Sequence, residues 1–195
     1  EYLSEKHANS KFVIDVKSTG LFFNNDVLKK NNCTIDMWKT GHSLIKSKMF
    51  EMKSPLAGEM SGHIFFADEY YGFDDAVYAA LRLLRVLAAA GQSIDDIKDQ
   101  LFEMHNTPEL RFDCPDEKKF QIAEDVRQRL AKEKDVTIHT IDGVRVETRD
   151  GWWLLRASNT QPVLVARCES DNERGLQRLK DALATQLRAS GIAPP

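Results

Sequence analysis

The sequence predicts a layered α/β domain followed by an α+β domain that has an antiparallel sheet and two helices. In the first half, short apolar runs of strand type alternate with helical segments, which is typical of layered α/β domains. In the second half, two Asp-Gly turns separate short strands, and a helical pattern lies on each side of them. The order of predicted strands and helices changes at His105–Pro108, so we expect domains over residues 1–104 and 105–195.

Five segments make up the first part of the α/β domain. Phe12–Val16 is a short apolar run of the kind that forms a buried strand, and Cys33–Trp38 predicts a second strand. Leu21–Lys30 between them predicts a short helix. Ile64–Phe66 predicts a further strand. His42–Met52 predicts a helix because apolar residues recur in it at helical spacing, namely Leu44, Ile45, Met49 and Met52.

The most apolar helical pattern of the sequence follows two aspartates. We expect Asp74 to cap this helix and Asp75 to lie at the positive end of the helix dipole. Gly91 ends the helix, and Ser93 opens a second helix with Asp96 as its capping partner. The apolar stripe is wide enough that we expect most of the helix surface to be buried; it comprises Val77, Ala80, Leu81, Leu83, Leu84, Leu87 and Ala88.

The α+β domain is expected to begin with a strand at Leu110–Cys114 and a helix at Glu117–Lys132. The dipeptides Asp142-Gly143 and Asp150-Gly151 then predict two tight hairpins. The last helix, Asn172–Ser190, has leucines on one face at helical spacing, namely Leu176, Leu179, Leu183 and Leu187.

Composition narrows the class of protein. The net charge of -3 and the pI of about 6.0 give no basic field for nucleic acid or anionic lipid. Cys33, Cys114 and Cys168 are scattered, so neither a disulfide framework nor a zinc site follows, and we expect three free thiols in the cytoplasm. The apolar run Ala76–Ala90 is too short for a membrane span, and two arginines interrupt it. We expect no nucleic-acid and no membrane partner.

Gly58–His63, with the sequence GEMSGH, is the first polar motif and lies between a predicted helix and a predicted strand. Its two glycines let the backbone turn sharply and approach a ligand closely. The Glu59 carboxylate and the Ser61 hydroxyl suit neighbouring sugar hydroxyls, and His63 adds a titratable imidazole. The alternative is a solvent-exposed loop whose polar residues bind nothing.

Arg156–Pro162, with the sequence RASNTQP, is the second motif and lies where a hairpin turns. It combines a guanidinium, two hydroxyls, an amide and several turn N–H groups in one loop. Such a loop is suited to a dianionic phosphate. The alternative is an Asn/Thr turn beside one surface arginine.

Together the two motifs resemble the α-D-phosphohexomutase family, specifically its phosphomannomutase/phosphoglucomutase branch. Asp15–Thr19 and Trp38–Ser43 also resemble family segments in order and spacing, so the resemblance covers essentially the whole chain. It implies that GEMSGH is the sugar loop of the family's third domain and that the RASNT-type loop is the phosphate loop of its fourth. The family's SHNP-like phosphoserine loop and DGDxD magnesium loop are absent from the sequence. We therefore expect domains three and four only, from a longer mutase.

The resemblance also implies roles for individual residues. It assigns contacts with the sugar to Glu59, Met60, Ser61 and His63. It assigns phosphate binding to Arg156, Ser158, Asn159 and Thr160. It assigns supporting catalytic or positioning roles to Lys17, His42 and His63, where either histidine can transfer a proton. Without the resemblance, Lys17 could be a solvated strand end, His42 a helix cap and His63 a packing residue of the loop.

The activity implied is the interconversion of hexose 1-phosphate and hexose 6-phosphate through a bisphosphorylated hexose, which also serves as activator. Mg²⁺ and the phosphoserine belong to the absent N-terminal half, so we expect no metal site here, a monomer, and an inactive isolated chain. Met60 favours mannose or glucose phosphates, because phosphoglucosamine mutases usually carry Gln at that position. Three alternatives stay open: a non-catalytic phosphosugar-binding module, a phosphoglucosamine mutase fragment, and a protein that interacts through the helix of residues 75–90.

Overall fold

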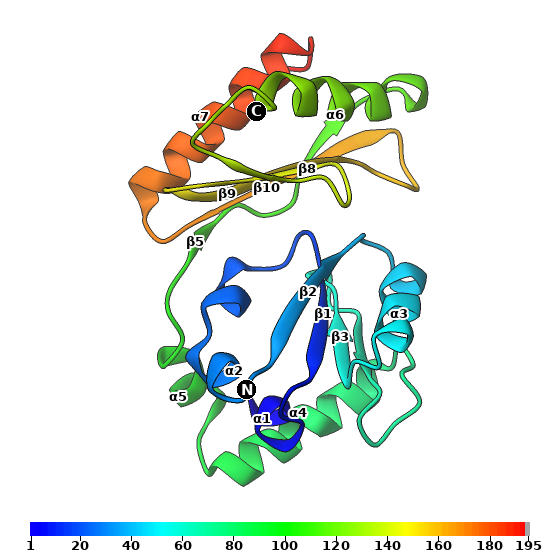
Figure 1. Cartoon of the computed structure of the whole chain (residues 1–195), viewed down its shortest axis with the longest axis vertical. Coiled ribbons are helices and arrows are strands. Elements are labelled where there is room, and N and C mark those ends of the chain that lie inside the picture. The colour runs from blue at the N-terminus through cyan, green and yellow to red at the C-terminus, as the bar shows by residue number, and fades with distance from the viewer. Residues whose placement is uncertain (194–195) are drawn as a thin grey trace. The chain divides into compact units, whose positions relative to one another are not determined.

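The computed structural model describes residues 1–193 of the chain (Figure 1). The chain divides into two compact units, of which the first is Glu1–Phe102 and the second begins at Glu103. We call them unit 1 and unit 2. Each has its own sheet and its own hydrophobic core.

Unit 1 contains a four-stranded sheet with the order β2-β1-β3-β4. Strand β1 pairs in parallel with β2 and β3, while β3 and β4 are antiparallel. Strands β1, β2 and β4 confirm the three strands predicted from the sequence. Strand β3 was not predicted, because three residues are too few to give an alternating pattern. The bounds are β1 Lys11–Asp15, β2 Thr34–Trp38, β3 Leu56–Gly58 and β4 Ile64–Phe66.

Unit 1 also contains five α-helices and one 3₁₀ helix, η1, in the described residues. The helix predicted over Leu21–Lys30 is two short helices, because the Asn25 side chain accepts a hydrogen bond from the amide of Leu28 at 3.0 Å and starts a new helix there. Helix α3 packs on the sheet through Ile45 and Met49, which are fully buried. The bounds are α1 Tyr2–Lys6, η1 Gly20–Asn24, α2 Asp26–Lys30, α3 His42–Glu51, α4 Ala76–Ala90 and α5 Ile94–Asp99.

The cap of α4 differs from the prediction. Asp75, not Asp74, is the N-cap, and its Oδ1 accepts a hydrogen bond from the amide of Tyr78 at 2.9 Å. Asp74 lies one residue too early because its backbone forms an antiparallel bridge with Phe65. The other predicted helix ends are confirmed: Gly91 takes the left-handed conformation after α4, and Ser93 and Asp96 form a capping box on α5.

The predicted burial of α4 is wrong. Its apolar stripe lies open to solvent, with exposed fractions of 72% for Val77, 58% for Leu81 and 61% for Leu84. The buried residue of the helix is instead Arg82, whose Nη2 donates a hydrogen bond to the Asp68 carboxylate at 2.5 Å. The helix therefore faces the sheet with its arginine, and nothing in residues 1–193 covers the apolar stripe.

Unit 2 is an antiparallel sheet with the order β5-β10-β9-β8-β7, and β6 pairs with the free part of β10. Both predicted Asp-Gly hairpins are confirmed: Gly143 and Gly151 have φ values of 75° and 121°, which favour glycine. The strands are β5 His105–Asn106, β6 Leu110–Asp113, β7 Thr137–His139, β8 Val144–Thr148, β9 Gly151–Ala157 and β10 Val163–Ser170.

Two helices cover one face of this sheet, α6 over Asp116–Leu130 and α7 over Glu173–Ala189 (Figure 1). The predicted leucine face of α7 is confirmed, since Leu179, Leu183 and Leu187 are buried in the core. The fold class is therefore as predicted: a layered α/β unit followed by an α+β unit with two helices.

Two further findings concern the whole described chain. Cys33, Cys114 and Cys168 are free and buried, and burial raises the pKa of Cys168 to about 12. No helix within residues 1–193 has both the length and the apolar character that a membrane crossing requires.

Candidate functional site

The GEMSGH loop is the tight connection between β3 and β4 in unit 1. The amide of Glu59 donates to the carbonyl of His63 at 2.9 Å, and the amide of Gly62 donates to the carbonyl of Glu59 at 3.0 Å. Gly62 has a φ of 95°, which side chains rarely adopt. The loop thus has a fixed backbone, and it continues a sheet strand rather than following a helix as predicted.

Asp15 joins three of the predicted segments. Its side chain is fully buried at the end of β1. Its Oδ1 accepts hydrogen bonds from the Ser18 hydroxyl at 2.6 Å and from the Met60 amide at 3.1 Å, and its Oδ2 accepts one from the Thr40 hydroxyl at 3.1 Å. The Lys17 ammonium lies 4.0 Å from the same carboxylate. One buried carboxylate therefore holds the DVKST, WKTGHS and GEMSGH segments at one place.

This convergence follows from the sheet topology. Strands β1, β2 and β3 run in parallel, so their carboxyl ends meet at the same edge of the sheet. All three segments were identified from the sequence, but no pattern in it indicated that Asp15 ties them together. An aspartate directly after a buried strand is the signal that could have suggested it.

Glu59 is the central carboxylate of the GEMSGH loop. Only 8% of the residue is exposed, and its Oε1 accepts a hydrogen bond from the Gly41 amide at 3.2 Å. The Ser61 hydroxyl donates to Oε2 at 3.3 Å. Burial raises the pKa of the Glu59 carboxyl and the Asp15 carboxylate raises it further, whereas His63 and Lys17 lower it. A carboxylate anchored in this way keeps acceptor capacity for a ligand hydroxyl.

Two histidines lie beside Glu59. The ring centroids of His42 and His63 are 6.0 Å apart. His42 opens α3 directly after Gly41, and His63 directly precedes β4. The Nδ1 of His63 lies 2.6 Å from Oδ2 of Asp74. The capping pattern had suggested the wrong role for Asp74, which is a partner of His63 and not a helix cap.

The second motif joins β9 to β10 in unit 2. The Ser158 hydroxyl oxygen accepts hydrogen bonds from the amides of Thr160 at 3.3 Å and Gln161 at 3.2 Å. The Nζ of Lys119 donates to the carbonyl of Gln161 at 2.9 Å. Ser158 therefore shapes the loop, while Asn159 and Thr160 are exposed at its tip.

Arg156 is held from the neighbouring turn. Its Nε donates to Oδ2 of Asp142 at 2.9 Å, and only 4% of the residue is exposed. Asp142 belongs to the Asp-Gly turn before β8, and no sequence pattern connected it with Arg156. A carboxylate that engages Nε leaves the terminal nitrogens of the guanidinium to point elsewhere.

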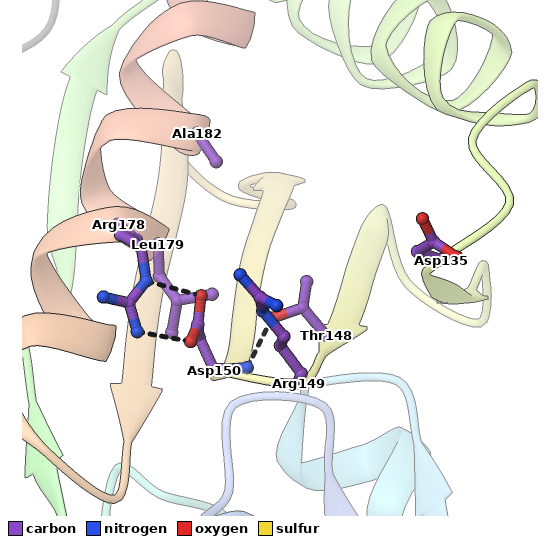
Figure 2. A pocket seen from close by; sticks show the side chains of 7 residues that line it. All are labelled: Asp135, Thr148, Arg149, Asp150, Arg178, Leu179 and Ala182. Atoms are coloured by element: carbon purple, nitrogen blue, oxygen red, sulfur yellow. Dashed lines mark hydrogen bonds and ion pairs between the residues drawn. The ribbon is translucent and has the colours of Figure 1, made fainter.

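Unit 2 also has a hollow of about 760 Å³ beside the middle of α7, shown in Figure 2. Arg178 forms two hydrogen bonds to Asp150 there, at 2.8 and 2.5 Å. Two arginines and two aspartates balance in its wall, so the hollow has no excess charge for an anion. Its lining contains none of the predicted site residues; it comprises Asp135, Thr148, Arg149, Asp150, Arg178, Leu179 and Ala182.

Comparison with protein families accounts for both units. The family model described as phosphoglucomutase/phosphomannomutase, alpha/beta/alpha domain III, matches residues 1–105. The model of the C-terminal domain of phosphoglucomutase/phosphomannomutase matches residues 109–186. The chain belongs to the phosphoglucomutase/phosphomannomutase family. The predicted resemblance is thereby confirmed.

Individual relatives agree with this. The chain is 46% identical to a phosphomannomutase/phosphoglucomutase of Pseudomonas putida, over 93% of this chain and 39% of that protein. The crystal structure of a phosphoglucomutase/phosphomannomutase family protein from Burkholderia thailandensis matches with a TM-score of 0.86 and 35% identity, over 97% of this chain and 40% of that one. The chain thus spans about two fifths of the length of these relatives.

A distant neighbour shows the same fold. It is a variant of an N-acetylphosphoglucosamine mutase of Aspergillus fumigatus, solved in complex with glucose 1,6-bisphosphate. The match has a TM-score of 0.62 and 13% identity, over 95% of this chain and 39% of that one. At this identity the likeness concerns the fold alone.

Proposed function

We propose that this chain is the substrate-binding part of a phosphomannomutase/phosphoglucomutase, which interconverts hexose 1-phosphate and hexose 6-phosphate through a bisphosphorylated hexose. The observation that carries the proposal is the site around Asp15, where a buried carboxylate holds three family segments together. Membership of the family and the names of the relatives support it. The three buried free thiols support a cytoplasmic location.

The sugar loop would bind the hexose ring. Glu59 and Ser61 form a joint acceptor and donor, suited to two adjacent hydroxyls on a pyranose. Met60 lies between them, and its amide is tied to Asp15 at 3.1 Å. Because the ring must bind in two orientations during the reaction, contacts to ring hydroxyls are better suited than contacts to one end of the sugar.

The Arg156 loop would bind the phosphate that is not being transferred. Asp142 orients the guanidinium through Nε, while Ser158 and Thr160 supply hydroxyls and Asn159 supplies an amide. Charge-assisted bonds of this kind are about twice as strong as neutral ones. The substrate proposed is therefore a sugar phosphate, with mannose and glucose phosphates favoured by Met60.

The supporting polar residues of unit 1 are Lys17, His42 and His63. Their proposed task is to position the substrate and to move a proton, while phosphoryl transfer itself needs a phosphoserine and Mg²⁺. Within residues 1–193 no group of three or more His, Cys, Asp or Glu side chains could hold a metal ion. We expect the chain alone to bind substrate without turning it over, because the family's phosphoserine and magnesium loops do not occur in its sequence.

Calorimetric titration of the chain with glucose 1-phosphate and mannose 1-phosphate tests this proposal. We expect saturable binding that Arg156→Ala weakens by roughly 10- to 100-fold, which is the loss of one charge-assisted contact. Arg188→Ala is the matched control, because Arg188 is an exposed arginine of α7 in the same unit. Equal affinity of the two variants, or no saturable binding of either sugar phosphate to the native chain, would overturn the proposal.

A further inference from the structure

His63 and Asp74 form a side-chain pair, of which the proposed function gives a role to His63 alone. The Nδ1 of His63 and Oδ2 of Asp74 are 2.6 Å apart, which is a short hydrogen bond between an imidazole and a carboxylate. The residues are eleven positions apart in sequence and lie on different segments, the sugar loop and the chain before α4. The pair is thus built by the fold rather than by local sequence.

The backbone fixes both partners. Asp74 forms an antiparallel bridge with Phe65, whose side chain is fully buried. The carbonyl of His63 accepts the hydrogen bond of the Glu59 amide at 2.9 Å. The next residue, Asp75, caps α4. The carboxylate of Asp74 therefore does not bond the helix amides and instead contacts the imidazole of His63. Each partner therefore lies on a segment whose backbone is held by pairing.

The chemistry of the partners sets the tautomer of the histidine. An ionised carboxylate only accepts hydrogen bonds, so the hydrogen of this bond belongs to Nδ1. In the neutral form, His63 then presents Nε2 as an unprotonated acceptor. We propose that Asp74 is a positioning residue that fixes His63 in the Nδ1–H tautomer and in one ring orientation, so that Nε2 exchanges a proton with a hydroxyl of the sugar phosphate.

This inference rests on the proposed function for its substrate. One proton moves between a sugar oxygen and Nε2 of His63. When a sugar hydroxyl attacks the phosphorus of the phosphoserine that the proposed function requires, an O–P bond forms to the sugar and the serine O–P bond breaks, so that the serine oxygen leaves. The O–H bond of the attacking hydroxyl breaks as well, and its proton moves to Nε2 of His63. The imidazolium that forms is stabilised by the carboxylate of Asp74 through the existing bond. In the second half-reaction the serine oxygen attacks phosphorus and the sugar O–P bond breaks. The proton then returns from Nε2 to the sugar oxygen that leaves, so neither residue is changed over a full cycle.

Other groups near His63 do not serve this purpose. The ring of His42 lies 6.0 Å away between centroids, too far for a hydrogen bond between the two rings in this arrangement. Glu59 acts on His63 through charge, but its oxygens are bonded to Gly41 and Ser61. The alternative role of the pair is a surface ion pair, since 45% of the His63 side chain and 37% of the Asp74 side chain are exposed.

The tautomer can be measured directly in the 195-residue chain. Long-range ¹H–¹⁵N spectra distinguish Nδ1–H from Nε2–H imidazoles, and the His63→Asn variant assigns the signal. We expect the Nδ1–H form for neutral His63, and a shift toward Nε2–H in Asp74→Asn, whose amide can donate to Nδ1. Asp95→Asn, an exposed aspartate of α5, is the matched control and should leave the spectrum unchanged. A native Nε2–H tautomer, or an unaltered tautomer in Asp74→Asn, would refute the inference.

Kinetics of the full-length protein that carries this sequence give the second readout. We expect Asp74→Asn to lower kcat by roughly 10- to 100-fold with little change in KM, within the ~10²–10⁴-fold effect of a positioned acid or base. Asp74→Glu should restore part of the rate, and Asp74→Asn should cost nothing further in a His63→Asn background. Independent losses in the double variant would refute the coupling. An inactive native enzyme with the expected His63 tautomer would instead refute the proposed function alone.

Discussion

Replacing Asp15 by alanine should loosen the whole candidate sugar site. The carboxylate accepts hydrogen bonds from the Ser18 hydroxyl, the Thr40 hydroxyl and the Met60 amide, and it is fully buried. A buried donor left without an acceptor costs ~1–3 kcal/mol. The two hydroxyls can turn to other acceptors whereas the Met60 amide cannot, so we expect a loss of about 1–3 kcal/mol in the unfolding free energy of unit 1.

Hydrogen exchange at increasing urea concentration, followed by mass spectrometry, measures this loss in unit 1 separately. We expect protection to fall together in peptides that cover residues 15–20, 38–43 and 58–63, while peptides of α7 are unchanged. Asp15→Asn keeps one acceptor oxygen and should lose less. Asp99→Ala, at the exposed end of α5, is the control. If Asp15→Ala lowered stability no more than Asp99→Ala, Asp15 would not be what holds the three segments together.

Three further predictions concern charge and exposed apolar surface. Glu59→Gln should raise the urea midpoint at pH 7 and should weaken sugar phosphate binding. The midpoint rises because the folded pKa of the Glu59 carboxyl is raised, so that its charged form costs stability above the unfolded pKa. The gain in midpoint should therefore vanish below about pH 4. The pKa of Asp68 is lowered although burial opposes this, because Arg82 and His7 bond to its carboxylate. Its stabilisation is present above the unfolded pKa and is lost as the pH falls through the folded pKa, so Asp68→Asn should flatten the acid limb of a stability–pH curve. The chain alone should self-associate through the open stripe of α4, and Leu81→Lys should lower the sedimentation coefficient at high concentration, whereas Lys98→Ala should not.

The strands and hairpins were predictable where the pattern was long enough. Phe12–Val16 and Cys33–Trp38 are continuous apolar runs, and the two Asp-Gly dipeptides encode turns with glycine at positive φ. Strand β3 was missed, because Leu56–Gly58 is too short to show a pattern and is a strand through its pairing with β4 and with Val13 and Ile14 of β1. The pairing with β1 depends on residues far away along the chain, which no local window contains.

The error over α4 has a different cause. A stripe of Val77, Leu81 and Leu84 shows that one side of a helix is apolar, but it does not show what covers that side. Arg82 takes the position that faces the sheet. Its guanidinium is hydrogen-bonded to Asp68 and lies over the ring of Phe66, with the guanidinium carbon 4.7 Å from the ring centroid. A buried arginine cannot be recognised from helical spacing alone.

The candidate site was predictable as a set of segments and not as a set of contacts. The motifs contain the residue types that a sugar and a phosphate require. The residues that hold them in place, Asp15, Asp74 and Asp142, were either unremarked or assigned another role. Asp74 and Asp75 illustrate the reason: both fit the capping pattern, and only the backbone bridge to Phe65 decides which of them begins the helix.

Each of the two candidate binding loops is built by contacts within its own unit. In unit 1, Asp15 fixes the loop that carries Glu59; in unit 2, Asp142 fixes Arg156 and the Ser158 hydroxyl fixes the backbone of its loop. Neither arrangement needs a ligand to form, which favours binding because less ordering is required when the ligand arrives. It follows that Glu59→Ala and Arg156→Ala should have additive effects on the stability of the free chain, since each residue is bonded within its own unit. Urea denaturation of both single variants and of the double variant measures this, and a double variant that departs from the sum of the two losses would contradict it.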